Sequence, residues 1–187
     1  MIADITPPNT EPITLETAKL FLRIDHADED GLITDFIQSA RIQIETLCRQ
    51  TLITRSQRLT LTPPFDRALS LNVAPIQSVD KVTLHLVEDA TESVPLENSI
   101  VNLRSAPATL TPKTLGLFGW NKRSDIQAIT VEVTAGYGDT VADVPMPLRQ
   151  AMLLLVGQAY EYRAGQNAPS IPMMVDALIM PYRSLKL

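Results

Sequence analysis

The sequence predicts an α+β protein, mainly an α-helical bundle with a small antiparallel β region inserted between the second and third helices. Apolar residues recur at helical spacing over residues 14–51, alternate with polar residues over 52–135, and cover most faces of a long helix at 145–164. A chain of 187 residues can build one core, or a core with a small subdomain, so we expect a single domain.

The first half of the helical pattern holds two helices. Residues 1–12 are rich in proline and predict an extended arm, after which Thr14 is placed to cap a short helix that runs to about Ile24. The carboxylates of the acidic turn at 25–31 are expected to stabilise the start of the next helix, because they lie at the positive end of its dipole. A calcium site is disfavoured, since the twelve-residue calcium-binding loop is missing. The second helix should run from about Asp30 to about Gln50, with Ile42 on its polar side.

Alternation of apolar and polar residues predicts the strands of the inserted region. Strands are expected at 58–62, 69–73, 79–87 and 126–134, with a further hairpin formed by 93–96 and 100–103. Residues 104–125, which contain Trp120, should be irregular because prolines and glycines interrupt them.

The strand before Gly136 leads through Gly138 and Pro147 into a long helix, since proline suits the first turn of a helix. Apolar side chains cover nearly the whole of this helix, and Leu154 interrupts its narrow polar stripe. Such a helix must be covered on more than one side, either by the protein's own core or by another subunit.

The C-terminal segment 165–187 follows a break that holds Gly165 and Pro169. The stretch Met173–Met180 is amphipathic and too short to be a stable helix in isolation. Two interpretations stand: the segment packs on the long helix of its own chain, or it docks on a partner.

Composition argues against catalysis, metal binding and membrane insertion. The single Cys48 and the distant His26 and His85 supply no zinc ligand set, and no phosphate-loop, dinucleotide or hydrolase motif is present. The longest apolar run is far too short to span a bilayer, and no signal peptide is apparent, so we expect a soluble, unexported protein without cofactors. The net charge of −5 and the scattered Lys and Arg residues argue against a DNA-gripping surface.

At several places the sequence resembles the head–tail connector (adaptor) proteins of long-tailed phages, prophages and gene transfer agents. The similar stretches before the tail are 13–19 with 22–23, 28–53, 135–138, 144–145, 147–151, 153–156, and 160–161 with Arg163. In the tail they are Pro172, 176–178 and 181–183. Two departures are visible: Cys48-Arg49-Gln50 stands where the family often has Thr-Gly-Arg, and Asn121 follows Trp120 where the family commonly has proline.

The resemblance implies a structural subunit that forms a ring of about twelve copies in the neck of the particle and lets DNA pass without specific binding. Its partners would be the portal protein above, neighbouring copies, and a head-completion (stopper) or tail-terminator protein below, with no membrane. The chain would be located in the neck of the particle, and in the bacterial cytoplasm during assembly. The alternatives are a non-viral protein-binding module and, third, a small-molecule enzyme.

We expect residues of the tail to form the portal-docking arm: Met173, Met174, Leu178, Tyr182, Arg183, Leu185 and Leu187. Candidate contacts between subunits are Ile42, Leu154 and Trp120.

Overall fold

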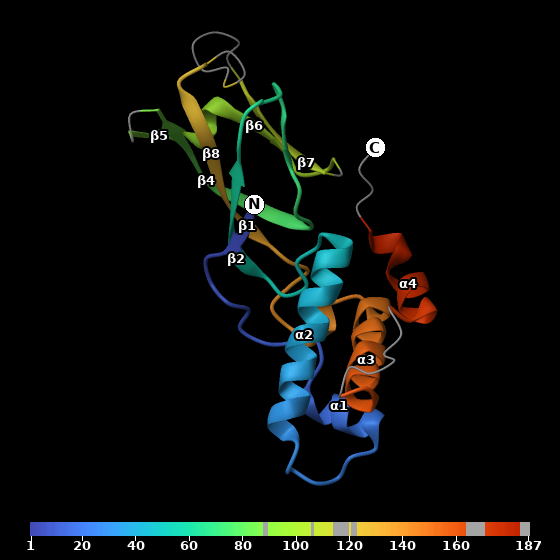
Figure 1. Ribbon diagram of the computed structural model, residues 1–187. Coiled ribbons are helices and arrows are strands. Elements are labelled where there is room, and N and C mark those ends of the chain that lie inside the picture. Colours follow the sequence, from blue (N-terminus) through green and yellow to red (C-terminus); the bar gives the residue numbers. More distant parts are fainter. Residues whose placement is uncertain (88–89, 106, 114–119, 121–122, 164–170, 184–187) are drawn as a thin grey trace. The chain divides into compact units, whose positions relative to one another are not determined.

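The computed structural model describes residues 1–87, 90–105, 107–113, 120, 123–163 and 171–183. The chain divides into two compact units (Figure 1). We call residues 1–7 and 54–136 the β unit, and residues 8–53 and 137–187 the helical unit. Each unit has its own core of buried apolar side chains, so each is described by itself.

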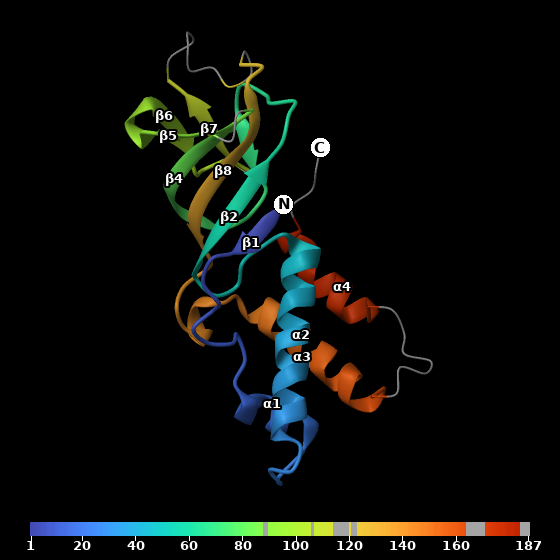
Figure 2. The same cartoon turned by 60° about the vertical axis from the view of Figure 1, so that its left-hand side comes forward.

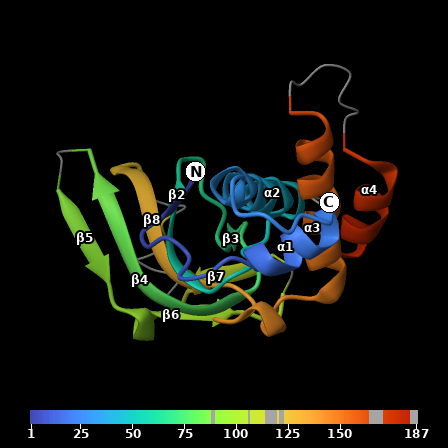
Figure 3. The same ribbon diagram turned by 90° about the horizontal axis from the view of Figure 1, so that it is seen from below.

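Four α-helices and two short 3-10 helices build the described part of the helical unit. They are α1 (Leu15–Leu22), α2 (Asp30–Cys48), η3 (Val141–Asp143), α3 (Met146–Glu161), α4 (Met173–Ile179) and η4 (Met180–Tyr182). α3 lies between α2 and α4 (Figures 1 and 3), and α1 packs against both α2 and α3.

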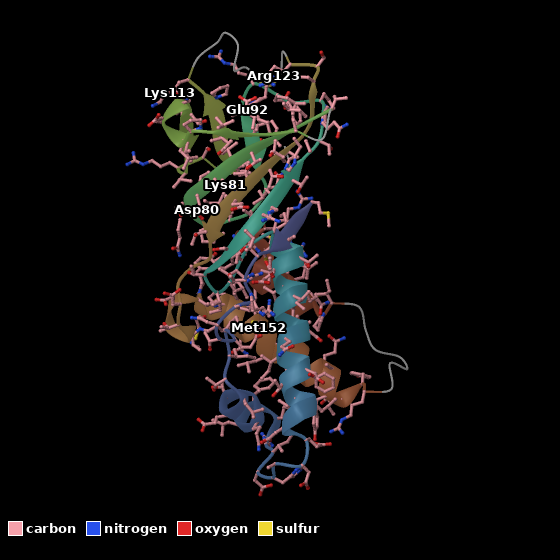
Figure 4. All side chains as sticks on the ribbon, turned by 90° about the vertical axis from the view of Figure 1, so that its left-hand side faces the viewer. Asp80, Lys81, Glu92, Lys113, Arg123 and Met152 are labelled. Atoms are coloured by element: carbon pink, nitrogen blue, oxygen red, sulfur yellow. The ribbon has the colours of Figure 1, made fainter. Side chains whose placement is uncertain are left out.

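α3 is the central element of the helical unit. No residue between Ala151 and Tyr160 is exposed, and Met152, which is fully buried, lies among the helices (Figure 4). The prediction of a core helix is therefore confirmed, because α1, α2 and α4 of the same chain cover its sides.

The ends of α1 and α2 are fixed by specific contacts. Thr14 caps α1 as predicted, since its Oγ1 accepts the Thr17 N–H at 3.1 Å. Arg49 ends α2 in the left-handed region with φ 55°, where the family often has glycine. A residue with a Cβ pays about 1–2 kcal/mol for this conformation. The bonds from the Arg49 and Gln50 N–H groups to the Glu45 carbonyl oxygen help to offset this cost.

Glu29 joins the turn between α1 and α2 to the end of α3. Its side chain does not cap α2, contrary to what we expected of this turn; instead its carboxylate accepts hydrogen bonds from the Tyr160 hydroxyl and the Arg163 guanidinium. Arg163 also stacks on the Tyr160 ring, with its Cζ 4.0 Å from the ring centroid. These bonds, first to Arg163 and then to Tyr160, lower the pKa of Glu29.

The β unit contains two antiparallel sheets. The larger has the strand order β1-β2-β8-β4-β5, and Figure 2 shows β1, β2, β8 and β4 side by side in this order. The smaller has the order β3-β7-β6. The bounds are β1 (Ile2–Asp4), β2 (Arg55–Leu61), β3 (Leu69–Leu71), β4 (Ile76–Leu86), β5 (Thr91–Val94), β6 (Ser99–Asn102), β7 (Ala108–Pro112) and β8 (Ile126–Ala135), with the 3-10 helix η1 (Leu96–Asn98) between β5 and β6. β8 is followed by Gly136, whose φ of 138° suits glycine.

The strand predictions need two corrections. The stretches predicted as one hairpin, 93–96 and 100–103, form strands of different sheets: β5 pairs with β4, and β6 pairs with β7. Pro95 and η1 separate them, because proline cannot donate a ladder hydrogen bond. The region 104–125, which was predicted to be irregular, contains β7. Its alternation of buried and partly buried residues covers only five residues and ends at Pro112.

Apolar side chains from both sheets fill the core of the β unit. Trp120 is only 1% exposed there, and its indole N–H donates to the Arg67 carbonyl oxygen at 3.3 Å. At one end of the unit, Arg123 pairs with Glu92 at 2.9 Å and with Asp125 at 2.7 Å (Figure 4).

The predicted α+β class is confirmed, but the description as mainly a helical bundle is not. The described residues hold eight strands beside four α-helices, and β4 and β8 have 11 and 10 residues. One strand, β1, comes from the proline-rich arm before α1. All three of its residues are exposed, so it has no alternation of buried and exposed positions that would mark it as a strand.

Two glycines should respond oppositely to alanine. At Gly157 of α3 a Cβ would lie 3.0 Å from the edge of the Phe21 ring, which is 41% exposed and can shift. We expect Gly157→Ala to stabilise the protein by up to about 1 kcal/mol through helix propensity.

At Gly138 a Cβ would lie 2.4 Å from the Asp143 carboxyl group, which Thr140 holds in place. We expect Gly138→Ala to cost about 1–3 kcal/mol. Urea denaturation of both variants checks the two signs.

The Glu29 network should make stability depend on pH. Because the pKa of Glu29 is lowered in the folded state, its contribution is present above the ordinary value of about 4.5 and is lost as the pH falls below it. Glu29→Gln should therefore lower the melting temperature at neutral pH and flatten its decline at acidic pH. Arg163→Gln should have the same effect. The melting temperature of the double variant should be no lower than that of either single variant. Additive losses would mean that the two side chains act independently.

Candidate assembly surface

α4 is anchored to the core of the helical unit by one of its faces. Val175 and Ile179 are fully buried, and Leu178 and Tyr182 pack against the same core from partly buried positions. Figure 3 shows α4 lying along α3. The first interpretation of the tail, packing on its own long helix, therefore holds for this inner face.

A short chain of hydrogen bonds fixes the end of α4 and η4. The Gln50 side-chain amide donates to the Tyr182 carbonyl oxygen at 2.7 Å, and the Tyr137 hydroxyl donates to Gln50 Oε1 at 2.6 Å. Burial raises the pKa of Tyr137 to about 12, so this hydroxyl keeps its proton at neutral pH. The loop after β8 and the end of α2 thus hold the tail in one position.

The outer face of α4 is also apolar. Met173, Met174 and Met180 are 89%, 64% and 68% exposed, and Ala177 is exposed between them. Positions 173, 177 and 180 lie on one side of a helix of 3.6 residues per turn. The charged pair of Asp176 and Arg183, joined at 2.7 Å, is the flanking polar feature.

A seven-residue helix with apolar side chains on both its inner and outer faces is only half covered by its own chain. Methionine is flexible and polarisable, and it suits surfaces that adapt to a partner. We call Met173, Met174, Ala177 and Met180 the methionine face.

The other predicted contact residues lie in different surroundings. Ile42 is 55% exposed on α2, whereas Leu154 is partly buried against the core of the helical unit. Trp120 is enclosed in the core of the β unit, so it offers no surface to a neighbouring copy and we withdraw it from the candidates. Leu185 and Leu187 lie outside the described residues.

Sequence reasoning missed several exposed apolar residues of the helical unit, among them Leu20 at 81%, Phe21 at 41% and Met146 at 69%. Leu20 lies opposite Ala18 and Leu22 on α1, so a finer reading of the helical wheel would have placed it outside. Met146 is the first residue of α3, ahead of the buried Leu148.

The described residues offer no reactive constellation. They contain no group of three or more His, Cys, Asp or Glu side chains that could hold a metal ion. Cys48 is buried, and burial raises its pKa to about 11, which keeps the thiol protonated. No helix within the described ranges combines the length and apolar character needed to cross a membrane.

A family model agrees with the resemblance seen in the sequence. Residues 12–94 match the model of the phage gp6-like head-tail connector protein. The match spans α1, α2 and strands β2 to β5. The resemblance to head–tail connector proteins is thereby confirmed, and this family is structural rather than enzymatic.

Solved structures match over the whole chain. A chain in the neck of an empty gene transfer agent (GTA) particle computed with C6 symmetry is 23% identical with a TM-score of 0.81, and a chain in the virion of a native GTA particle gives the same two values. A chain in the neck of a native GTA particle computed with C12 symmetry is 22% identical with a TM-score of 0.74. Each comparison covers 100% of this chain and 97% of the other.

These structures establish a shared fold. No curated protein sequence gave a match. The fold similarity covers α3 and α4, which lie beyond the residues matched by the family model.

The two faces of α4 should separate in mutagenesis. Replacing Met173, Met174 and Met180 together by serine should change the free energy of unfolding by less than about 0.5 kcal/mol per site, because all three are exposed. Deleting residues 172–187 should cost several kcal/mol, because burial of Val175 and Ile179 contributes about 1.5–3 kcal/mol each. Urea denaturation followed by circular dichroism measures both. Equal stability of the two variants would show that α4 does not belong to the core.

Proposed function

We propose, from the match to the gp6-like head–tail connector family, that this chain is a structural adaptor subunit of a particle neck. About twelve copies form a closed ring below the portal of a tailed phage or gene transfer agent, join the head to the tail and let DNA pass. The chain assembles in the bacterial cytoplasm and ends in the neck of the particle, with both of its units forming one connector subunit.

The methionine face of α4 is the observation that supports docking on a partner within this proposal. It is an apolar surface on a helix whose other face is already fixed in the core, so it is free for a partner and needs little reorganisation to bind. We assign it to the portal protein. Arg183 pairs with Asp176 beside this face, and Tyr182 precedes it with its side chain against the core. Both residue types are common in the energetic centres of interfaces.

The similar structures support the ring. A chain with this fold occurs in a neck computed with C12 symmetry, which supports a ring of about twelve copies here. In such a ring each copy presents two different surfaces to its two neighbours. Ile42 and the partly buried Leu154 are candidate residues for this contact, and a stopper or tail-terminator protein would bind below.

The charge of the chain suits a passage for DNA. Proteins that hold DNA neutralise its phosphates with Lys and Arg, and here 21 acidic residues outnumber 16 basic ones. Weak interaction with the backbone would let the duplex move through the ring. We therefore expect no sequence-specific binding to DNA.

Assembly in cells tests the proposal. Cells that lack this chain should make complete particles again when the unmodified chain is supplied. Electron microscopy should place the chain between portal and tail. The triple serine variant of the methionine face should fold but leave filled heads without tails, because it loses its apolar contact with the portal.

Serine at Leu20 provides a matched control, since this leucine is 81% exposed on a different helix. This variant should complement normally if the methionine face is the docking site. Particles that contain the triple serine variant in normal amounts would refute docking through α4, and complete particles without the chain would refute the proposed function.

A further inference from the structure

The outward face of α2 carries no charge over most of its length. Its exposed residues between Asp35 and Arg49 are all neutral: Gln38, Ser39, Ile42, Gln43 and Thr46. Helix faces that remain in water usually carry Lys or Glu, whereas the centres of interfaces are depleted in charge. Ile42 lies in the middle of this face with 55% of its surface exposed. We call the surface from Asp35 to Arg49 the neutral face.

The two charges at the ends of the neutral face differ from the other charges of α2. Asp30 pairs with Lys19 at 2.6 Å, and Arg41 pairs with Glu11 at 2.8 Å and with Glu45 at 3.1 Å. Asp35 and Arg49 are exposed, and neither has an ion-pair partner among the residues that the structure describes. A surface with a neutral centre therefore ends in one negative and one positive side chain that remain available.

The spacing of these groups is symmetric about Ile42. Asp35 precedes it by seven residues and Arg49 follows it by seven. Seven residues are nearly two turns of an α-helix, so Asp35 lies within about 20° of the direction of Ile42. The backbone of Arg49, the left-handed residue that ends α2, follows the last helical turn on the same side. If a second α2 is laid antiparallel with Ile42 opposite Ile42, then Asp35 faces Arg49 of the other copy at both ends.

We propose that two copies of the free chain pair through the neutral face, with their α2 helices antiparallel and Ile42 at the two-fold axis. In an isologous contact, residue i of one copy meets residue j of the other, and j meets i. The neutral face satisfies this condition in three places: Ile42 meets itself, Gln38 meets Thr46, and Asp35 meets Arg49. The second copy is thus identified by charge complementarity.

This pair is a form of the free subunit and does not rest on the proposed function. A ring with rotational symmetry joins two different surfaces, so a two-fold pair of this kind cannot be repeated around it. The pair would cover Ile42 before assembly and would have to open for that surface to be used in a particle. The contact involves one helix face from each copy and should be weak.

Cysteine cross-linking at the axis tests the pairing directly. In Ile42→Cys the two thiols meet across the two-fold axis, and mild oxidation should give a covalent dimer on a non-reducing gel. The native Cys48 is fully buried and its thiol stays protonated, so it does not interfere. Leu20→Cys is the control, because Leu20 is more exposed than Ile42 but lies on α1. Equal cross-linking of the two variants would indicate random collision and overturn the proposal.

Charge exchange tests the orientation of the helices. Asp35→Arg places two arginines opposite each other, and Arg49→Asp places two aspartates opposite each other. Sedimentation equilibrium should show about ten-fold weaker self-association for each single variant, and the double variant should recover it. Asp tolerates the left-handed conformation at position 49, so the exchange does not force a new backbone there. Circular dichroism checks that each variant is folded.

Asp28→Arg is the matched control for charge, because its side chain is 93% exposed and lies outside the neutral face. It should associate like the unmodified chain. A double variant as weak as the single ones would overturn the antiparallel pair, and a chain that sediments as a single copy at all concentrations would overturn pairing altogether. Assembly of particles is not measured in these experiments, so their outcome is independent of the role in the neck.

Discussion

The need to cover α3 organises the helical unit. A helix that is apolar on nearly all sides cannot remain in water, and three helices of the same chain meet this need together. α2 and α4 lie on two sides of α3, and Phe21 of α1 packs over Gly157. The positions of the other helices follow from this requirement. The outward faces of α2 and α4 stay exposed in this arrangement.

Local sequence patterns were sufficient to predict the helices and most strands. Thr14 as a cap, the start of α2 at Asp30 and the proline-led start of α3 depend on neighbouring residues, and all three agree with the structure. Pairing between strands depends on residues far apart in the chain. β1 pairs with residues 57–59, and β5 and β6 belong to different sheets, so neither could be read from alternation alone.

The candidate surface was predictable in part for the same reason. The pattern of Met173–Met180 located an amphipathic segment, but Val175 and Ile179 needed α3 to define an inner face and leave the methionines outside. Trp120 shows the opposite case, since a lone aromatic residue in a loop-like stretch proved to be part of a core. Arg49 illustrates a substitution that local rules disfavour and that backbone bonds to Glu45 accommodate.

The order of the chain also sets the order in which its surfaces can be made. All residues of the β unit, including β1, have been synthesised when the ribosome reaches residue 136, whereas the helical unit still lacks α3 and α4. Domains generally fold as units during synthesis, so the β unit can fold first and the helical unit must wait. α4 is the last helix to emerge and needs α3 beneath it. A nascent chain that ends before residue 173 therefore cannot present the methionine face, which forms only when α4 packs on α3.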